Sequence, residues 1–268
     1  MVIYSHSRLS TFEQCALKFK YKYIDNLPPD YEQSIEGFLG NKVHEVLQWI
    51  YNNKDYKIDL DNIIKHFIEL WNKDYNTNIN IVKDLSVDYY FNKGIKFLVN
   101  YYTKHYPFKD NTIATEKKIY VNLDNNGEYK ILGFIDRLVH HKESNTFEIH
   151  DYKTGTLKSQ EELDNDRQLA LYSIAIRETY EDVNDIHLIW HFLDYNEQRF
   201  SKRTIDQLNK LRNNIIELIK YIESTTVFQP NPGALCNWCE FQSYCPAFKN
   251  LKMQKKDIEL DNGFFENN

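Results

Sequence analysis

The hydrophobic period of the chain changes at about residue 112, and this change restricts the possible folds more than any other feature. Before it, apolar residues recur at helical spacing, as at Val43 and Leu47. After it, three segments show the alternation that is typical of strands. These segments are residues 112–123, 129–140 and 146–153. The turn-forming run Asn125-Asn126-Gly127 separates the first two, so we predict three consecutive strands joined by short turns.

Segments with helical spacing lie on both sides of these strands. They are residues 7–23, 40–51, 61–105, 166–180 and 204–224, and one further strand is expected at 185–194. Helices before a run of strands, followed by alternating helix and strand, indicate an α/β fold. We therefore expect a mixed central sheet flanked by helices, with an N-terminal helical lobe.

Two carboxylates are expected to face each other across the turn between the second and third strands. If the hairpin is symmetric about Glu143 and Ser144, Asp136 lies directly opposite Asp151, with Cβ atoms about 4.5–5.5 Å apart. Carboxylates this close repel each other, so both stay ionised only with a cation between them. An odd-length loop or a bulge would break this register. The same alternation predicts one shared apolar face on the earlier strand, formed by Leu132, Phe134 and Leu138.

A lysine follows the second carboxylate on the same face of its strand. Oxygen ligands suit Mg²⁺ or Mn²⁺ better than zinc. Such an ion lowers the pKa of a bound water and stabilises the charge of a phosphoryl transition state. Lys153, two residues after Asp151, can position the attacking water or neutralise the developing charge. The alternative interpretation is a surface hairpin with scattered charges.

The four cysteines form a three-plus-one pattern. Cys236, Cys239 and Cys245 are spaced C-x2-C-x5-C, and Cys15 lies more than 200 residues earlier. In an intracellular chain such thiols favour metal over disulfide. Four thiolates fit zinc or a [4Fe-4S] cluster. The spacing and the trailing Pro246 favour iron–sulfur, which would tie the first helix to the C-terminus. The alternative is four ordinary buried cysteines.

Composition excludes some classes of function. The start of the chain does not resemble a signal peptide, and no stretch approaches the roughly 20 apolar residues of a membrane span. We therefore expect a cytoplasmic protein without a membrane partner. The net charge is −6, but basic residues gather at 8–22 and 202–220, where they either follow a nucleic-acid backbone or form solvated helix faces. The absence of a phosphate loop means that any unwinding of DNA requires a partner helicase.

Taken in order, six motifs resemble those of the PD-(D/E)XK nuclease superfamily. They are the opening segment 5–15, the G-x-x-x-H run 40–44, the G-x-x-D run 133–136, the D-x-K-T-G run 151–155, the Q-x-x-x-Y run 168–172 and the cysteine segment 236–245. The resemblance covers most of the chain. It is closest to the RecB-like branch with an iron–sulfur cluster, which includes the AddB nuclease domain and the CRISPR-associated single-domain exonucleases.

The resemblance implies a restriction-endonuclease-like core and specific roles for its motif residues. His44, Asp136 and Asp151 would bind Mg²⁺ or Mn²⁺ together with the carbonyl of Tyr152, and Lys153 would act on the water. Gln168 and Tyr172 would contact DNA or support the site; four residues apart, they share one helix face. Without the resemblance, we would interpret His44 and Tyr172 as core residues and Gln168 as a solvent-exposed residue. Glu116 is a candidate for indirect contact with the site.

The implied function is a metal-dependent deoxyribonuclease, an exonuclease acting on single-stranded DNA or duplex ends. We expect a single nuclease domain over residues 1–250. Its parts are a helical region 30–110, a catalytic core 111–225, a cluster-binding segment 226–248 plus Cys15, and then a charged tail 251–268. The resemblance also implies that the protein acts on DNA, with a separate helicase or repair partner, inside a bacterial or phage-infected cell. The alternative is a catalytically silent DNA-end binding protein or a scaffold subunit of a repair or CRISPR adaptation complex.

Overall fold

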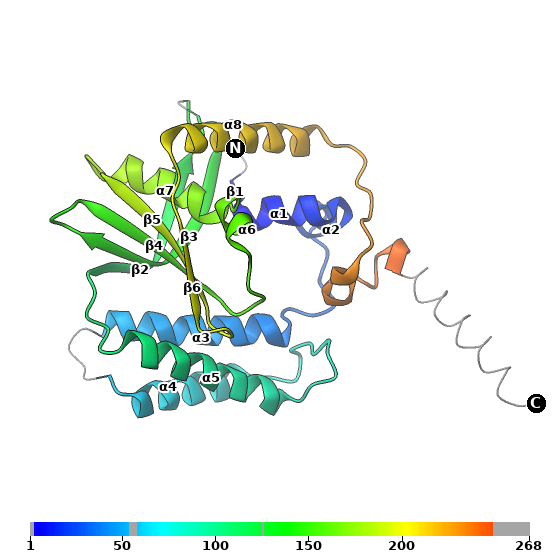
Figure 1. Cartoon of the computed structure of the whole chain (residues 1–268). Coiled ribbons are helices and arrows are strands. Elements are labelled where there is room, and N and C mark those ends of the chain that lie inside the picture. Colours follow the sequence, from blue (N-terminus) through cyan, green and yellow to red (C-terminus); the bar gives the residue numbers. More distant parts are fainter. Residues whose placement is uncertain (1–2, 54–57, 125, 249–268) are drawn as a thin grey trace, which may run out of the picture.

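The expected mixed α/β fold is confirmed: one mixed sheet is flanked by helices (Figure 1). The computed structural model describes residues 3–53, 58–124 and 126–248. The strands are β1 Tyr4–Ser5, β2 Thr112–Asn122, β3 Lys130–His141, β4 Thr146–Lys153, β5 Asp185–Phe192 and β6 Glu197–Ser201. Asn125, in the first predicted turn, and the predicted tail 251–268 lie outside the described residues.

The helices surround the sheet and form the N-terminal lobe. They are α1 His6–Gln14, α2 Ala16–Tyr23, α3 Ile35–Asn52, α4 Leu60–Asp74, α5 Val87–His105, α6 Gln160–Asp164, α7 Gln168–Thr179, α8 Ile205–Ser224 and the short 3-10 helix η1 Ala234–Trp238. In the described parts of the chain, none of them is both long enough and apolar enough to cross a membrane.

Two predicted helices are divided in the structure. The helix predicted over 7–23 is interrupted at Cys15, whose backbone is extended (φ −161°, ψ 107°). The helical region predicted over 61–105 ends at Asp74 and resumes at Val87, where the Ser86 hydroxyl caps the new helix. The helix predicted from residue 40 begins earlier, because the Ser34 hydroxyl accepts a hydrogen bond from Gly37 N–H (3.2 Å).

The register predicted for the hairpin is confirmed. Arg137 pairs with His150 and Leu138 with Ile149, so the same register places Asp136 opposite Asp151. The β3–β4 ladder stops at Arg137, whereas β1 pairs with β3 at Ile131 and Leu132. Because β2 runs along the other edge of β3, β1 and β4 share one edge and leave residues 133–136 between them. Asp136 lies in this gap.

The prediction of a shared apolar face for Leu132, Phe134 and Leu138 is wrong. Leu138 is buried, but Phe134 is 47% exposed, while Ile131 and Ile135 are buried instead. The alternation changes phase beside Glu116, the β2 residue that the register places opposite Asp136. Glu116 has a positive φ of 44°, a left-handed conformation that L-residues seldom adopt and that locally interrupts a regular strand. Asp136 therefore lies where the buried positions of β3 shift from Ile131 and Ile135 to Leu138, all three within one hydrophobic core.

Two hydrophobic cores meet near this point. One lies between the sheet and helices α1, α2, α7 and α8, and the other lies among α3, α4 and α5. Tyr152 of β4 belongs to the second core, whereas Ile149, three residues earlier, belongs to the first. Figure 1 shows α3, α4 and α5 gathered on one side of the molecule and α7 and α8 on the other. The carboxyl end of β4 is thus held between two packed layers.

Gly133 is required by a close approach of helix α7. A Cβ atom placed on Gly133 would lie 2.2 Å from the Tyr172 ring, far inside van der Waals contact. The glycine of the G-x-x-D motif therefore lets α7 pack against β3, and this packing sets the distance between α7 and the hairpin.

Gly133→Ala is expected to destabilise the fold by about 1–3 kcal/mol, because the added methyl group must displace Tyr172. Urea unfolding of the purified variant measures this loss. Gly155→Ala is the matched control, since a Cβ atom there would meet nothing within 4 Å. Equal stabilities of the two variants would show that Tyr172 does not hold its position over β3.

Candidate active site

His44, Glu116 and Asp136 converge from three separate elements. One side-chain donor atom from each lies within 4.8 Å of the others, and no other such group of three is found in the described parts of the chain. His44 Nδ1 is 3.5 Å from Asp136 Oδ2. One imidazole and two carboxylates are a donor set that suits Mg²⁺ or Mn²⁺. The geometry therefore brings two predicted ligands together and adds Glu116.

Glu116 is the residue of this group that the sequence reasoning underrated. We expected it to reach the site only indirectly, but its side chain shares the site with His44 and Asp136. The available signal was the antiparallel pairing of β2 with β3, because Thr115 pairs with Arg137 and Lys117 with Ile135. The alternation of apolar residues within each strand does not by itself fix that register.

The electrostatics of the group favour an additional positive charge. Burial raises the pKa of Asp136 to about 7, and the negative charges of Asp151 and Glu116 add to the rise. His44 and the Tyr152 N–H act in the opposite direction without cancelling it. Burial also raises the pKa of Glu116. A bound divalent cation would relieve the cost of ionising these carboxyl groups.

Asp151, Lys153 and Gln168 form a second group beside the first. Lys153 Nζ lies 2.7 Å from Asp151 Oδ2 and 3.0 Å from Gln168 Oε1. Burial opposes the charge of Lys153, but the Asp151 carboxylate outweighs it and raises the pKa of the ammonium. Lys153 is therefore a fixed positive charge, held by one strand residue and by the first residue of α7.

Tyr172 lies on the same side as Gln168, as their spacing predicted. Burial raises the pKa of the Tyr172 hydroxyl, although hydrogen bonds with the Gln168 side chain and the Phe134 backbone lower it. With its ring packed against Gly133, Tyr172 connects α7 to β3. The structure therefore brings both residues of the Q-x-x-x-Y motif to the site.

The main chain of Tyr152 joins the two groups. Its N–H donates to Asp136 Oδ2 (2.8 Å), and its carbonyl accepts from His44 Nε2 (2.9 Å). A carbonyl can only accept, so His44 Nε2 carries a proton in this contact, and Nδ1 is the ring nitrogen that faces Asp136. His44, Asp136 and Asp151 thus lie around one peptide segment, although the closest contacts of Asp151 are with Lys153.

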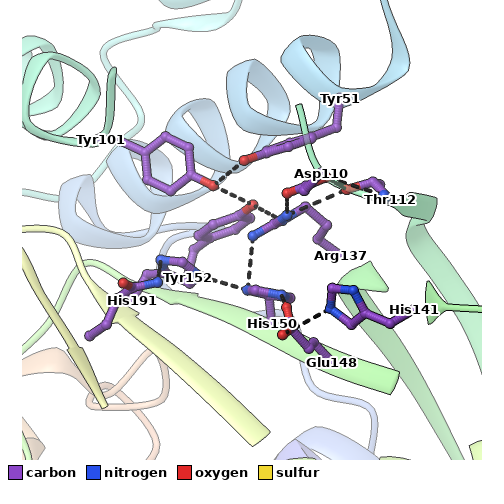
Figure 2. A network of polar contacts seen from close by, with 11 residues as sticks. Tyr51, Tyr101, Asp110, Thr112, Arg137, His141, Glu148, His150, Tyr152 and His191 are labelled. Atoms are coloured by element: carbon purple, nitrogen blue, oxygen red, sulfur yellow. Dashed lines mark hydrogen bonds and ion pairs between the residues drawn. The ribbon is translucent and has the colours of Figure 1, made fainter. Parts of the chain in front are cut away.

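The Tyr152 side chain is anchored on the opposite side by a buried polar network (Figure 2). Arg137 Nε donates to the Tyr152 hydroxyl (3.0 Å), and another Arg137 nitrogen donates to His150 Nδ1 (2.9 Å). Arg137 also pairs with Asp110. The Tyr152 hydroxyl lies 3.2 Å from that of Tyr101. Sequence reasoning missed this network, although Arg137 directly follows Asp136.

Burial keeps His150 of this network neutral. It holds the pKa of His150 well below its usual range, and the nearby Arg137 guanidinium adds to the effect. A neutral His150 can accept from Arg137, while its Nε2 lies 3.1 Å from Glu148 Oε2. The arginine charge is therefore compensated by Asp110 and by neutral acceptors, which makes its burial tolerable.

All four cysteines line one cavity of about 290 Å³ between α2 and the C-terminal segment. Cys15 lies at the junction of α1 and α2, and no disulfide joins it to the other three. Burial raises the pKa of the Cys239 thiol, although the Phe241 backbone and Lys18 act in the opposite direction. The sequence-predicted ligand set is therefore brought together in space.

Ion pairs and a hydrogen bond hold the C-terminal segment against α2. Glu240 forms ion pairs with Lys18 (2.7 Å) and Lys22 (2.9 Å). The Tyr21 hydroxyl donates to the Tyr244 carbonyl (3.2 Å). These contacts form one wall of the cavity. Lys18 and Lys22, which belong to the basic stretch at 8–22, are ion-paired in them.

The comparisons with known proteins agree with this architecture. The family model of the PD-(D/E)XK nuclease superfamily matches residues 3–246, so the chain belongs to that superfamily. Its members typically use divalent metals such as Mg²⁺. No curated protein matches the chain.

The solved structures that match the chain include the following two. A candidate exonuclease from Eubacterium rectale is 11% identical, with a TM-score of 0.53, and the match covers 92% of this chain and 87% of that one. At this identity the likeness shows a shared fold. The protein SSO0001 is 16% identical over 78% of this chain and 94% of its own, and its TM-score of 0.35 is too low to support an argument.

Asp136→Asn is expected to stabilise the cation-free protein at pH 8. A carboxyl group whose pKa rises from 3.8 to about 7 on folding lowers the stability as the pH increases between these values, and the loss is complete above pH 7. A shift of about three units corresponds to about 4 kcal/mol. Asparagine avoids this loss and still accepts from Tyr152 N–H.

Chemical denaturation in EDTA at pH 5 and pH 8 measures the effect. The wild-type protein should lose stability between these pH values relative to the variant, and Mn²⁺ should restore it only in the wild type. The same pH dependence in both proteins would show that Asp136 is not the group that titrates.

Proposed function

We propose that this protein is a metal-dependent deoxyribonuclease that hydrolyses DNA phosphodiester bonds as an exonuclease on single strands or duplex ends. The observation that carries the proposal is the junction at Tyr152. Its main chain contacts Asp136 and His44 of the carboxylate group, and the next residue is the ion-paired Lys153. A cation site and a fixed positive charge are thus adjacent, as phosphoryl transfer to water requires.

Some residues of the site would hold the cation, and Lys153 would act on the attacking water. His44, Asp136 and Asp151, with the Tyr152 carbonyl, would hold Mg²⁺ or Mn²⁺, and Glu116 is close enough to share that task. When bound, the cation would lower the pKa of a coordinated water and offset negative charge on the phosphate. Protonated Lys153 would orient the attacking water or balance the charge that develops on the phosphoryl oxygens.

Gln168 and Tyr172 support the site in this proposal. Gln168 accepts a hydrogen bond from Lys153 Nζ (3.0 Å), which keeps the ammonium beside Asp151. Tyr172 packs against Gly133 and hydrogen bonds to Gln168. Their contacts are with the catalytic strands, so we assign them positioning roles.

We further propose that the four cysteines bind a [4Fe-4S] cluster, as in the RecB/AddB-like branch of the superfamily. A zinc ion with Zn–S bonds of about 2.3 Å would hold four sulfurs about 3.8 Å apart. In the described residues, no three cysteine sulfurs lie within 4.8 Å of one another, yet all four line one cavity. This wider arrangement favours a cluster, which would link Cys15 to the C-terminal segment.

The remaining parts of the proposal concern organisation and setting. Residues 1–250 would form one nuclease domain, with a helical region 30–110, a catalytic core 111–225 and the cluster-binding segment. The protein would act on DNA in the cytoplasm, with a separate helicase or repair partner wherever strands must be opened. Complete retention of Asp136, Asp151 and Lys153 favours this enzyme over a silent DNA-end binding or scaffold subunit.

Asp151→Ala and Lys153→Ala are each expected to lower cleavage by about 10²–10⁴-fold. The first variant removes the carboxylate that holds Lys153, and the second removes the charge of the lysine. End-labelled single- and double-stranded oligonucleotides with Mg²⁺ or Mn²⁺ provide the assay. Lys96→Ala is the matched control, since Lys96 of α5 pairs with Asp194 rather than with a residue of the group. Undiminished digestion by pure Asp151→Ala protein would reject the assignment, and DNA binding without cleavage by the wild type would favour the silent subunit.

Cys236→Ala is expected to remove the brown colour and bound iron of the purified protein and to lower its Tm, because the cluster would connect the two ends of the domain. Iron analysis, absorption spectra and thermal unfolding measure these changes. Val227→Ala, at an exposed position before the cysteines, is the control. Zinc in place of iron in anaerobically purified wild-type protein would overturn the cluster.

A further inference from the structure

Three side chains are exposed together on one face of β2 and β3. Phe134 is 47% exposed and Tyr120 is 46% exposed, and Lys118 is exposed beside them. Lys118 pairs across the strands with Phe134, and Tyr120 pairs with Leu132. Residues directly opposite each other in an antiparallel pair share a face, so these three form one surface. We call Lys118, Tyr120 and Phe134 the β2–β3 platform.

The platform is continuous with the carboxylates of the candidate active site. Glu116 precedes Lys118 by two residues on β2, and Asp136 follows Phe134 by two residues on β3. Each step of two residues advances about 7 Å along a strand. The Phe134 row therefore lies about 7 Å, and the Tyr120 row about 14 Å, from the carboxylate row. His44 meets Asp136 at the near end, and the exposed Tyr120 lies at the far end.

The chemistry of the platform suits unpaired nucleotides. Aromatic rings stack on bases of any sequence, whereas the bases of a duplex are stacked on one another and offer their faces only at an end. The Lys118 ammonium lies 5.3 Å from the centre of the Tyr120 ring, where it can reach a phosphate beside a stacked base. Among the described residues, Lys118 has no acidic partner, in contrast to Lys18 and Lys202, which form ion pairs.

We propose that the β2–β3 platform binds single-stranded DNA, with bases stacked on Phe134 and Tyr120 and a phosphate at Lys118, and that it leads the strand to the carboxylates at Asp136. The inference rests on the proposed action on DNA and narrows its substrate to a strand with unpaired bases. A basic side chain beside two rings, in line with a phosphodiester-cleaving site, favours a nucleic-acid strand over a second copy of the chain.

Fluorescence anisotropy with labelled oligothymidylate, and with a blunt duplex of the same length, tests the proposal in EDTA, which prevents metal-dependent cleavage. Phe134→Ala and Tyr120→Ala should each weaken single-strand binding about ten-fold and change duplex binding less than two-fold. Lys118→Ala should reduce the slope of log affinity against log salt by about 0.7. Phe200→Ala, at a 70% exposed phenylalanine on β6, is the matched control and should bind like the wild type.

Conservative variants and cleavage kinetics separate stacking from folding. Phe134→Tyr should keep the affinity, and with Mn²⁺ the Phe134→Ala variant should raise KM for single strands more than it lowers kcat. If the wild type cleaves single strands and both alanine variants bind them with unchanged affinity, the platform proposal is wrong. The proposed function would not be affected by that result. A dimer seen in sedimentation that Phe134→Ala dissociates, without any change in DNA affinity, would assign the face to a second copy. Absence of both binding and cleavage in the wild type would instead reject the proposed function.

Discussion

The hydrogen bond from Tyr152 N–H to Asp136 (2.8 Å) is the contact on which the arrangement of the candidate site depends. It forms next to the point where the β3–β4 ladder ends, and the Tyr152 carbonyl accepts from His44. One peptide segment therefore sets the distance between the carboxylates and Lys153. The Tyr152 side chain cannot rotate away, because Arg137 and Tyr101 hold its hydroxyl in the second core.

The site is held at an energetic cost that the surrounding fold offsets. Asp136 is buried with a raised pKa beside other carboxyl groups, and Glu116 adopts a left-handed backbone conformation. Both features destabilise the cation-free protein, and both lie where a cation would bind. Active sites commonly retain such strain because the neighbouring core can bear it. Here the supporting layers are α3 on one side of the hairpin and α7 on the other.

Local patterns were sufficient for much of the framework. The period-two segments predicted β2, β3 and β4, and the symmetry of the turn predicted the register that pairs Arg137 with His150. The division at Cys15 and the phase change at Glu116 were not predicted, because both are single-residue departures from regular backbone. The short strands β1 and β6 were missed, since a two-residue and a five-residue element have too few positions to show a period.

The sequence by itself determined which residues are available for chemistry and in what order they occur. These are a histidine, two aspartates, a lysine and four cysteines, each within a short local motif. The tertiary structure alone decided which of them meet. It placed Glu116 with His44 and Asp136 and left Phe134 exposed. These outcomes depend on long-range strand pairing and on a backbone change of phase, and neither is encoded in the local alternation of apolar and polar residues.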